Sequence, residues 1–165
     1  MGKQRKLTAG EIALAEAAFG TKIDYKRVKL ADGPGNSFAA HIAFARGNPA
    51  ITLGSTVYFK HEFCDDFSRK GQNRKSYMHE MTHVWQYQKL GMAVFLLRYA
   101  DELVMAGGKP NDMYKYDVGK TLFNEAMLEA QADMVGDYSE ALWASNASRK
   151  ALLAKNMAGS GIYAF

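Results

Sequence analysis

The sequence has one cysteine and no long apolar run, and these absences limit the classes of protein to which it can belong. With Cys64 alone, no disulfide can form within the chain. The longest apolar stretch, Met92 to Leu97, is far shorter than the roughly 20 residues that a membrane-spanning helix needs. No apolar segment follows the basic N-terminus before Glu11. We therefore expect synthesis in the cytoplasm without a Sec-type signal peptide, and no stable membrane insertion.

The sequence also lacks a concentrated region of one charge. The net charge is +4, but the basic residues fall into three separate groups, within residues 3–6, 22–29 and 69–75. A nucleic-acid interface typically has one continuous basic stripe with interleaved aromatic residues, so we expect no nucleic-acid partner. The 165 residues are 48% hydrophobic, which is enough to form a core. We expect one domain over residues 1–165.

Local patterns predict strands early in the chain and helices later. Thr8 and Glu11 form a capping box, which predicts a helix over about residues 9–19. Alternating or β-branched segments predict strands at residues 25–30, 38–45 and 50–59, the last of them divided by Gly54-Ser55. Helical spacing of apolar residues predicts helices at 73–90, 93–105 and 122–144, with a further turn at 148–155. This order indicates an α+β fold.

The most informative motif is His79-Glu80-x-x-His83, which lies in one of the predicted helices. Residues four apart share a helix face, so the two imidazoles can bind one metal ion. Glu80 lies about 100° around the helix, where its carboxylate can reach a water held at that ion. This is the H-E-x-x-H motif of zinc metallopeptidases. By chance it should occur in roughly one in two hundred chains of this length, so we take it as a zinc site.

A catalytic zinc usually takes a third protein ligand, and the predicted helix at 122–144 supplies candidates. Glu125, Glu129 and Asp133 fall on one helix face, with no lysine or arginine one turn away to pair with them. We predict Glu129 as the ligand and Asp133 as the carboxylate that accepts a ligating histidine's spare N–H. Glu125 remains the alternative ligand.

These residues also carry a resemblance to known families. His79-Glu80-x-x-His83 followed by Glu129-x-x-x-Asp133 resembles the gluzincin type of zinc metallopeptidase. The chain is also similar to bacterial Vgr-related proteins and to the metallopeptidase extension of some type VI secretion spike proteins. The segments that carry this second similarity are Leu7–Glu11, Phe19–Tyr25, Ile51–Gly54, His79–Gln88 and Glu129–Asp133. The resemblance implies a zincin-like single domain, bound Zn²⁺ and a role as or beside a secreted antibacterial effector.

The motif predicts hydrolysis of a peptide or amide bond, with Glu80 as general base. The substrate would be a peptide, a protein or the peptide part of a cell wall. A phenol should stabilise the oxyanion, and among Tyr87, Tyr114 and Tyr116 we select Tyr116. The resemblance further implies delivery by type VI secretion into a target-cell periplasm, and spike components or a cognate immunity protein as partners.

Two other interpretations remain open. The domain can be a catalytically silent module for binding or as an adaptor, in which zinc only stabilises the fold, or a toxin that hydrolyses the peptide part of a cell wall and is not a general protease. A second metal site around His61, Glu62 and Cys64 has no recognised ligand spacing, and a lone histidine such as His41 is usually structural or exposed. Neither of these two features is expected to take part in the zinc site.

Overall fold

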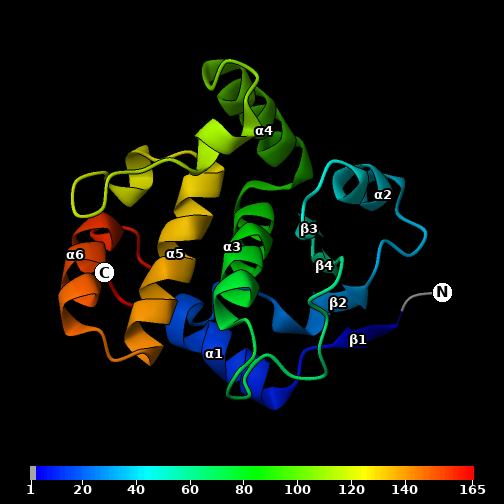
Figure 1. Cartoon of the computed structure of the whole chain (residues 1–165), viewed down its shortest axis with the longest axis horizontal. Coiled ribbons are helices and arrows are strands. Elements are labelled where there is room, and N and C mark those ends of the chain that lie inside the picture. The colour runs from blue at the N-terminus through cyan, green and yellow to red at the C-terminus, as the bar shows by residue number, and fades with distance from the viewer. Residues whose placement is uncertain (1–2) are drawn as a thin grey trace.

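A computed structural model describes residues 3–165, which form a small mixed sheet and a larger set of helices (Figure 1). The sheet lies in the N-terminal half, and α3 and α5 run side by side through the molecule with α6 packed beyond α5 (Figure 1). The predicted α+β class is therefore confirmed. None of the helices within residues 3–165 has both the length and the apolar composition needed to cross a bilayer.

The sheet has four strands in the order β1-β2-β4-β3. The outer pairs are antiparallel and the central pair, β2 with β4, is parallel. The strands are β1 Gln4–Lys6, β2 Lys29–Asp32, β3 Ala50–Leu53 and β4 Thr56–Phe59. As an outer strand, β3 leaves one edge without a strand partner, and it packs against α3.

The helices occupy most of the chain after residue 73. The α-helices are α1 Ala9–Phe19, α2 Phe38–Ala45, α3 Arg74–Leu90, α4 Met92–Met105, α5 Leu128–Trp143 and α6 Ala147–Met157. Three short 3₁₀ segments connect them, namely η1 Tyr25–Arg27, η2 Pro110–Tyr114 and η3 Phe123–Glu125. The helices predicted at 9–19, 73–90 and 93–105 are confirmed, and the segment predicted at 50–59 as one strand or half of a hairpin forms the two strands β3 and β4.

The strand predicted at 38–45 is wrong, because this segment forms α2. Ser37 precedes it as N-cap, and its hydroxyl accepts the backbone N–H of Ala40 at 3.2 Å. Four of the eight residues in α2 are alanine, the best helix former, and this preference outweighs the weak alternation of apolar residues.

Other predicted boundaries are shifted. The strand predicted at 25–30 is replaced by η1 and then by β2, and the turn predicted at 148–155 lies within the full helix α6. The helix predicted from residue 122 begins only at Leu128, because Ala126 and Met127 have extended backbones with ψ of 153° and 159°. Strand β1 was not predicted.

Helices α3 and α5 approach each other closely at Gly136. A Cβ atom at this position would lie 3.1 Å from the backbone oxygen of Lys75 and 3.8 Å from Cβ of His79. A larger residue would therefore push the two helices apart. Glu129, Asp133 and Gly136 share one face of α5 at spacings of four and three residues, so this contact directs that face toward His79.

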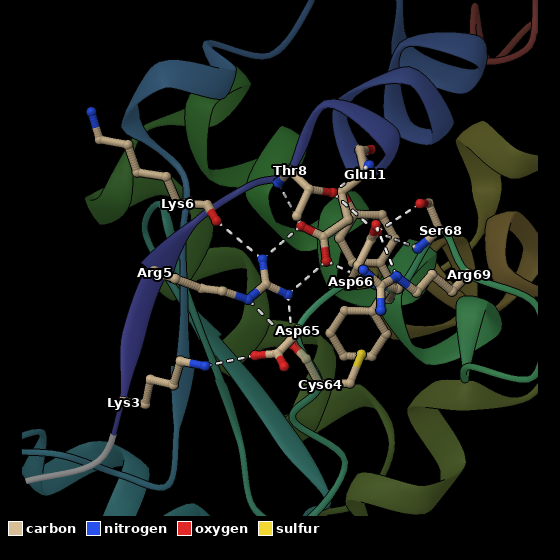
Figure 2. Close-up of polar contacts among 12 residues, drawn as sticks. Lys3, Arg5, Lys6, Thr8, Glu11, Cys64, Asp65, Asp66, Ser68 and Arg69 are labelled. Carbon is tan, nitrogen blue, oxygen red and sulfur yellow. Dashed lines mark hydrogen bonds and ion pairs between the residues drawn. The ribbon is translucent and has the colours of Figure 1, made fainter.

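A buried ion pair joins the N-terminal elements to α3 (Figure 2). The Glu11 carboxylate is fully buried and accepts two hydrogen bonds from the Arg5 guanidinium, each 2.7 Å long. It also accepts the backbone N–H groups of Thr8 and Phe67 at 2.8 and 2.9 Å. Tyr77 of α3 donates its hydroxyl to the backbone oxygen of Glu11 at 2.9 Å. One residue thus connects β1, α1, the loop before α3 and α3 itself.

We predict that Glu11→Gln lowers the free energy of unfolding by about 3 kcal/mol, because the change at the fully buried Glu11 removes the counter-charge of the half-buried Arg5 guanidinium. Urea denaturation followed by circular dichroism measures this change. Asp65→Asn is the control, since Asp65 forms only an exposed ion pair with Lys3, and its midpoint should stay close to that of the wild type. Equal midpoints for Glu11→Gln and the wild type would show that this ion pair does not hold the fold together.

Candidate metal centre

Helix α3 presents His79 and His83 on one face, one turn apart. The helix begins after Asn73, whose side chain accepts the backbone N–H of Ser76 at 3.0 Å, and it ends at Gly91, which has a φ of 80°. Most of its residues from Tyr77 to Tyr87 are buried. The two imidazole planes are nearly perpendicular, and their Nε2 atoms lie 3.2 Å apart.

Helix α5 brings Glu129 to the same point. Its Oε2 atom lies 3.1 Å from Nε2 of His83 and 3.4 Å from Nε2 of His79. Four ligands at about 2.0–2.1 Å from a tetrahedral ion lie roughly 3.3 Å from one another. The three separations therefore match three corners of a tetrahedral zinc site. Among residues 3–165, these three form the one group of His, Cys, Asp and Glu side chains arranged to hold a metal ion.

The outer nitrogen of each imidazole is held by an acceptor. Nδ1 of His79 lies 2.8 Å from Oδ1 of Asp133, and Nδ1 of His83 lies 2.8 Å from Oε1 of Gln86. The Gln86 amide nitrogen donates to Gln131 Oε1 and to the backbone oxygen of Leu128, so its oxygen is the atom left to accept from His83. In the neutral form that binds a metal ion, each imidazole would therefore carry its proton on Nδ1 and leave Nε2 as the ligand atom.

The carboxylates around His79 and His83 favour positive charge at the three candidate ligands. Burial opposes protonation of His79, but its hydrogen bonds to Asp133 and Glu129 outweigh burial and raise its pKa to about 10. Burial likewise opposes protonation of His83, yet Glu129 raises its pKa above the ordinary value. Burial alone would raise the pKa of Glu129, whereas the two imidazoles hold it well below its usual range. A divalent cation would satisfy the same three groups with more charge than a proton carries.

Glu80 lies beside this group and is held by the sheet. Its carboxylate is 6% exposed, and its Oε2 accepts the hydroxyl of Thr52 at 2.7 Å. Thr52 lies in β3, so the outer strand positions the carboxylate that follows His79 in sequence. The other carboxylate oxygen has no protein hydrogen-bond donor among residues 3–165 and remains available to a water molecule.

Two tyrosines lie at the centre, and Tyr116 is not one of them. The Tyr114 ring stacks on His79 with ring centroids 6.0 Å apart. Burial, together with the negative charge of Glu129, raises the pKa of Tyr114 well above its usual value and that of Tyr99 to about 12, so both hydroxyls stay protonated. Tyr116, which we selected from the sequence, instead donates its hydroxyl to Asp137, one turn beyond Asp133. The structure thus places Tyr114, and not Tyr116, against a candidate metal ligand, and the oxyanion role of Tyr116 stays a prediction.

The start of α5, next to Glu129, is held by a side chain from α4. Helix α5 has no side-chain N-cap of its own, and the buried carboxylate of Glu102 accepts the backbone N–H of Leu128 at 2.7 Å. Arg98 bonds to Glu102 at 2.7 Å and to the backbone oxygen of Ala126 at 3.2 Å. Helix α4 thus fixes the residues immediately before the third candidate ligand.

The remaining residues considered from the sequence lie elsewhere. Glu125, the alternative ligand, is exposed in η3 and outside the cluster. His41 and His61 are exposed on α2 and on the loop before α3, and Glu62 contacts Asn73. Sequence reasoning missed Thr52, Gln131 and Glu102, because each acts through contacts between distant elements and none lies in a recognisable spacing pattern.

The chain matches the eCIS core domain over residues 6–91, just over half of its length. It belongs to the eCIS core domain family. The match includes His79, Glu80 and His83 but ends before Glu129.

Two further comparisons cover more of the chain. The chain is 34% identical over 142 residues to the type VI secretion system spike protein VgrG2b of Pseudomonas aeruginosa, which covers 81% of this chain but only 13% of that protein. It also resembles the solved effector domain of Pseudomonas aeruginosa VgrG2b, with a TM-score of 0.66 and 28% identity. That similarity covers 94% of this chain and 82% of the solved domain.

We predict that Glu129→Gln weakens zinc binding by at least about 100-fold, since even loss of a carboxylate that only orients a ligand costs 10–100-fold. Competition with a chromophoric chelator measures the affinity. Glu125→Gln is the matched control, because Glu125 is an exposed carboxylate in η3, four residues before Glu129. This variant should bind zinc like the wild type. A larger loss in Glu125→Gln than in Glu129→Gln would reverse the assignment of the third ligand.

Proposed function

We propose that this protein is a zinc-dependent peptidase of the gluzincin type, with residues 1–165 forming one zincin-like metallopeptidase domain. The observation that carries the proposal is the convergence of the two Nε2 atoms and the Glu129 carboxylate at tetrahedral spacing, with the Glu80 carboxylate beside them. His79, His83 and Glu129 would hold the ion. When bound there, zinc would polarise the scissile carbonyl and acidify a water molecule.

The chain's own groups would then move the protons. Glu80, with one oxygen held by Thr52, takes a proton from the attacking water on its other oxygen and delivers it to the leaving amine. Tyr114 stays protonated at neutral pH, so its hydroxyl donates a hydrogen bond to the oxyanion. Asp133 and Gln86 keep the two imidazoles in the tautomer that directs Nε2 inward.

The edge of β3 that has no strand partner within residues 3–165 is the surface that would align the substrate. β3 is the outer strand of the sheet, and its Thr52 contacts Glu80 directly. An extended peptide that pairs with this edge would carry its backbone past the catalytic carboxylate. Such pairing uses main-chain hydrogen bonds and therefore suits a peptide, a protein segment or the peptide part of a cell wall.

The comparisons support a role in bacterial antagonism. The similar region of Pseudomonas aeruginosa VgrG2b is called an effector domain, and the full-length relative is a type VI secretion spike protein. We infer that this domain is an effector delivered by type VI secretion into a target-cell periplasm, with spike components and a cognate immunity protein as partners.

We predict that Glu80→Gln retains zinc and lowers the hydrolysis rate by about 100- to 10,000-fold, since it removes only the general base. Zinc content by mass spectrometry and turnover of a quenched-fluorescent casein would be measured together. Glu16→Gln, an exposed acid on α1, serves as control and should match the wild type. Bound zinc without any turnover in the wild type would favour the silent binding or adaptor module instead.

A second experiment addresses localisation. We expect the wild-type domain to slow growth when it is exported to the periplasm of a bacterial host and to have little effect when it is kept in the cytoplasm. Glu80→Gln should be harmless in both compartments, because the toxicity depends on hydrolysis. Equal toxicity of the two periplasmic proteins, at equal levels by immunoblot, would exclude an enzymatic toxin.

A further inference from the structure

A groove of about 470 Å³ lies between the β3–β4 turn, the end of α3 and the start of α4. The side chains and backbone that shape it include Ser55 in the turn, Tyr87 and Gln88 on α3, and Met92 on α4. Its rim carries the cations Arg27 and Lys29, and no acidic residue lines it. The groove is separate from the three candidate metal ligands, none of which lines it.

The two cations have no partner within the part of the chain that the structure describes. Arg27 and Lys29 are both exposed, and neither side chain forms an ion pair or a hydrogen bond with residues 3–165. The nearby carboxylate of Asp24 accepts the backbone N–H of Lys26 at 3.2 Å. Two unpaired cations without a carboxylate among them give the groove a local excess of positive charge, which favours an anionic group.

The groove lies just beyond the end of β3, the strand proposed to pair with the substrate. β3 contacts Glu80 through Thr52, and the turn residues Gly54 and Ser55 that follow it form one wall. The backbone oxygen of Ser55 accepts the N–H of Lys29 at 2.9 Å, which holds the backbone of Lys29 against the turn. Two to three residues of extended chain span about 7–10 Å, so a peptide paired with β3 reaches the groove within that distance of Thr52.

Helix α3 extends from the candidate metal centre to the groove. Tyr87 lies one helical turn after His83, and its ring stacks on Phe95 with centroids 3.7 Å apart. The Tyr87 ring is only 6% exposed, so it forms a wall rather than a surface on which a nucleotide base could stack. This favours a peptide over a nucleic acid as the anionic occupant.

We propose that this groove is a substrate subsite for a carboxylate of an acidic peptide, two to three residues from the bond that is cleaved. The proposal rests on the peptidase function proposed above. Arg27 and Lys29 bind the carboxylate, while the backbone of the same peptide pairs with β3. The domain thereby selects peptides that carry aspartate, glutamate or a terminal carboxylate on one side of the scissile bond.

The first test measures binding without catalysis. Glu80→Gln protein with zinc added is titrated with capped tetraglutamate, capped tetraglutamine and tetraglutamine with a free C-terminus, and amide shifts are followed by nuclear magnetic resonance. Capped tetraglutamate should move the amides of Gly54, Ser55 and Gly91, and capped tetraglutamine should not. Shifts with the free C-terminus alone would assign the site to a terminal carboxylate.

Substitutions at the two cations provide the matched comparison. Arg27→Ala with Lys29→Ala should weaken tetraglutamate binding at least tenfold, whereas Lys26→Ala, an exposed neighbour outside the groove, should leave it unchanged. Tetraglutamate shifts that map elsewhere, or that persist in the double variant, would overturn the proposal. Tighter binding of inorganic phosphate or octathymidylate at the same amides would overturn it in favour of a phosphate site.

The second test maps cleavage in a bacterial proteome digest by mass spectrometry. Wild-type cleavage sites should be enriched in aspartate or glutamate two to three residues away on one side, and the double variant should lose that enrichment while Lys26→Ala keeps it. Cleavage without acidic enrichment would overturn the subsite even if peptidase activity stands. No cleavage by the zinc-loaded wild type would overturn the peptidase function, and the binding titration would still decide whether the groove takes a carboxylate.

Discussion

The close packing of α3 against α5 is the constraint on which the candidate centre depends. Gly136 lets the helices approach until a Cβ would crowd the Lys75 backbone. Two ligands come from one helix and the third from the other, so a small change in helix separation would alter the distances between ligand atoms. The bond lengths at zinc leave little tolerance for such a change. The lack of a side chain at Gly136 is therefore as important to the geometry of the site as the ligand side chains are.

The sequence predicted the parts of the site that follow from helix periodicity. His79 and His83 share a face through their spacing of four. The same spacing placed Glu125, Glu129 and Asp133 on one face, and the structure brings the last two of these to the histidines. Tyr116 could not be assigned in this way, because the direction of a side chain after an irregular loop depends on tertiary contacts. The error at 38–45 was of another kind, since the apolar alternation was weaker than the helix preference of its alanines.

The eCIS core domain match contains only part of the candidate metal centre. The matched residues include β2, β3, β4, α1 and α3, and so contain the two histidines, Glu80 and the Thr52 that holds it. Glu129 and its supporting groups come from the helical C-terminal half, and the similarity to the solved VgrG2b effector domain, at 94% of this chain, extends into that half. The site is thus formed where an N-terminal half of shared architecture meets a helix that the family match does not include.

Helix α5 takes its N-terminal cap from Glu102 of α4, and this affects when the site can form. A helix that lacks its own N-cap is less stable in isolation. The first turn of α5 is therefore stabilised only after α4 has packed beside it and Glu102 accepts the Leu128 N–H. Until then a newly made chain offers two histidines on a local helix but no fixed third ligand. Tight retention of a metal ion should therefore come late in maturation, after the tertiary fold has assembled.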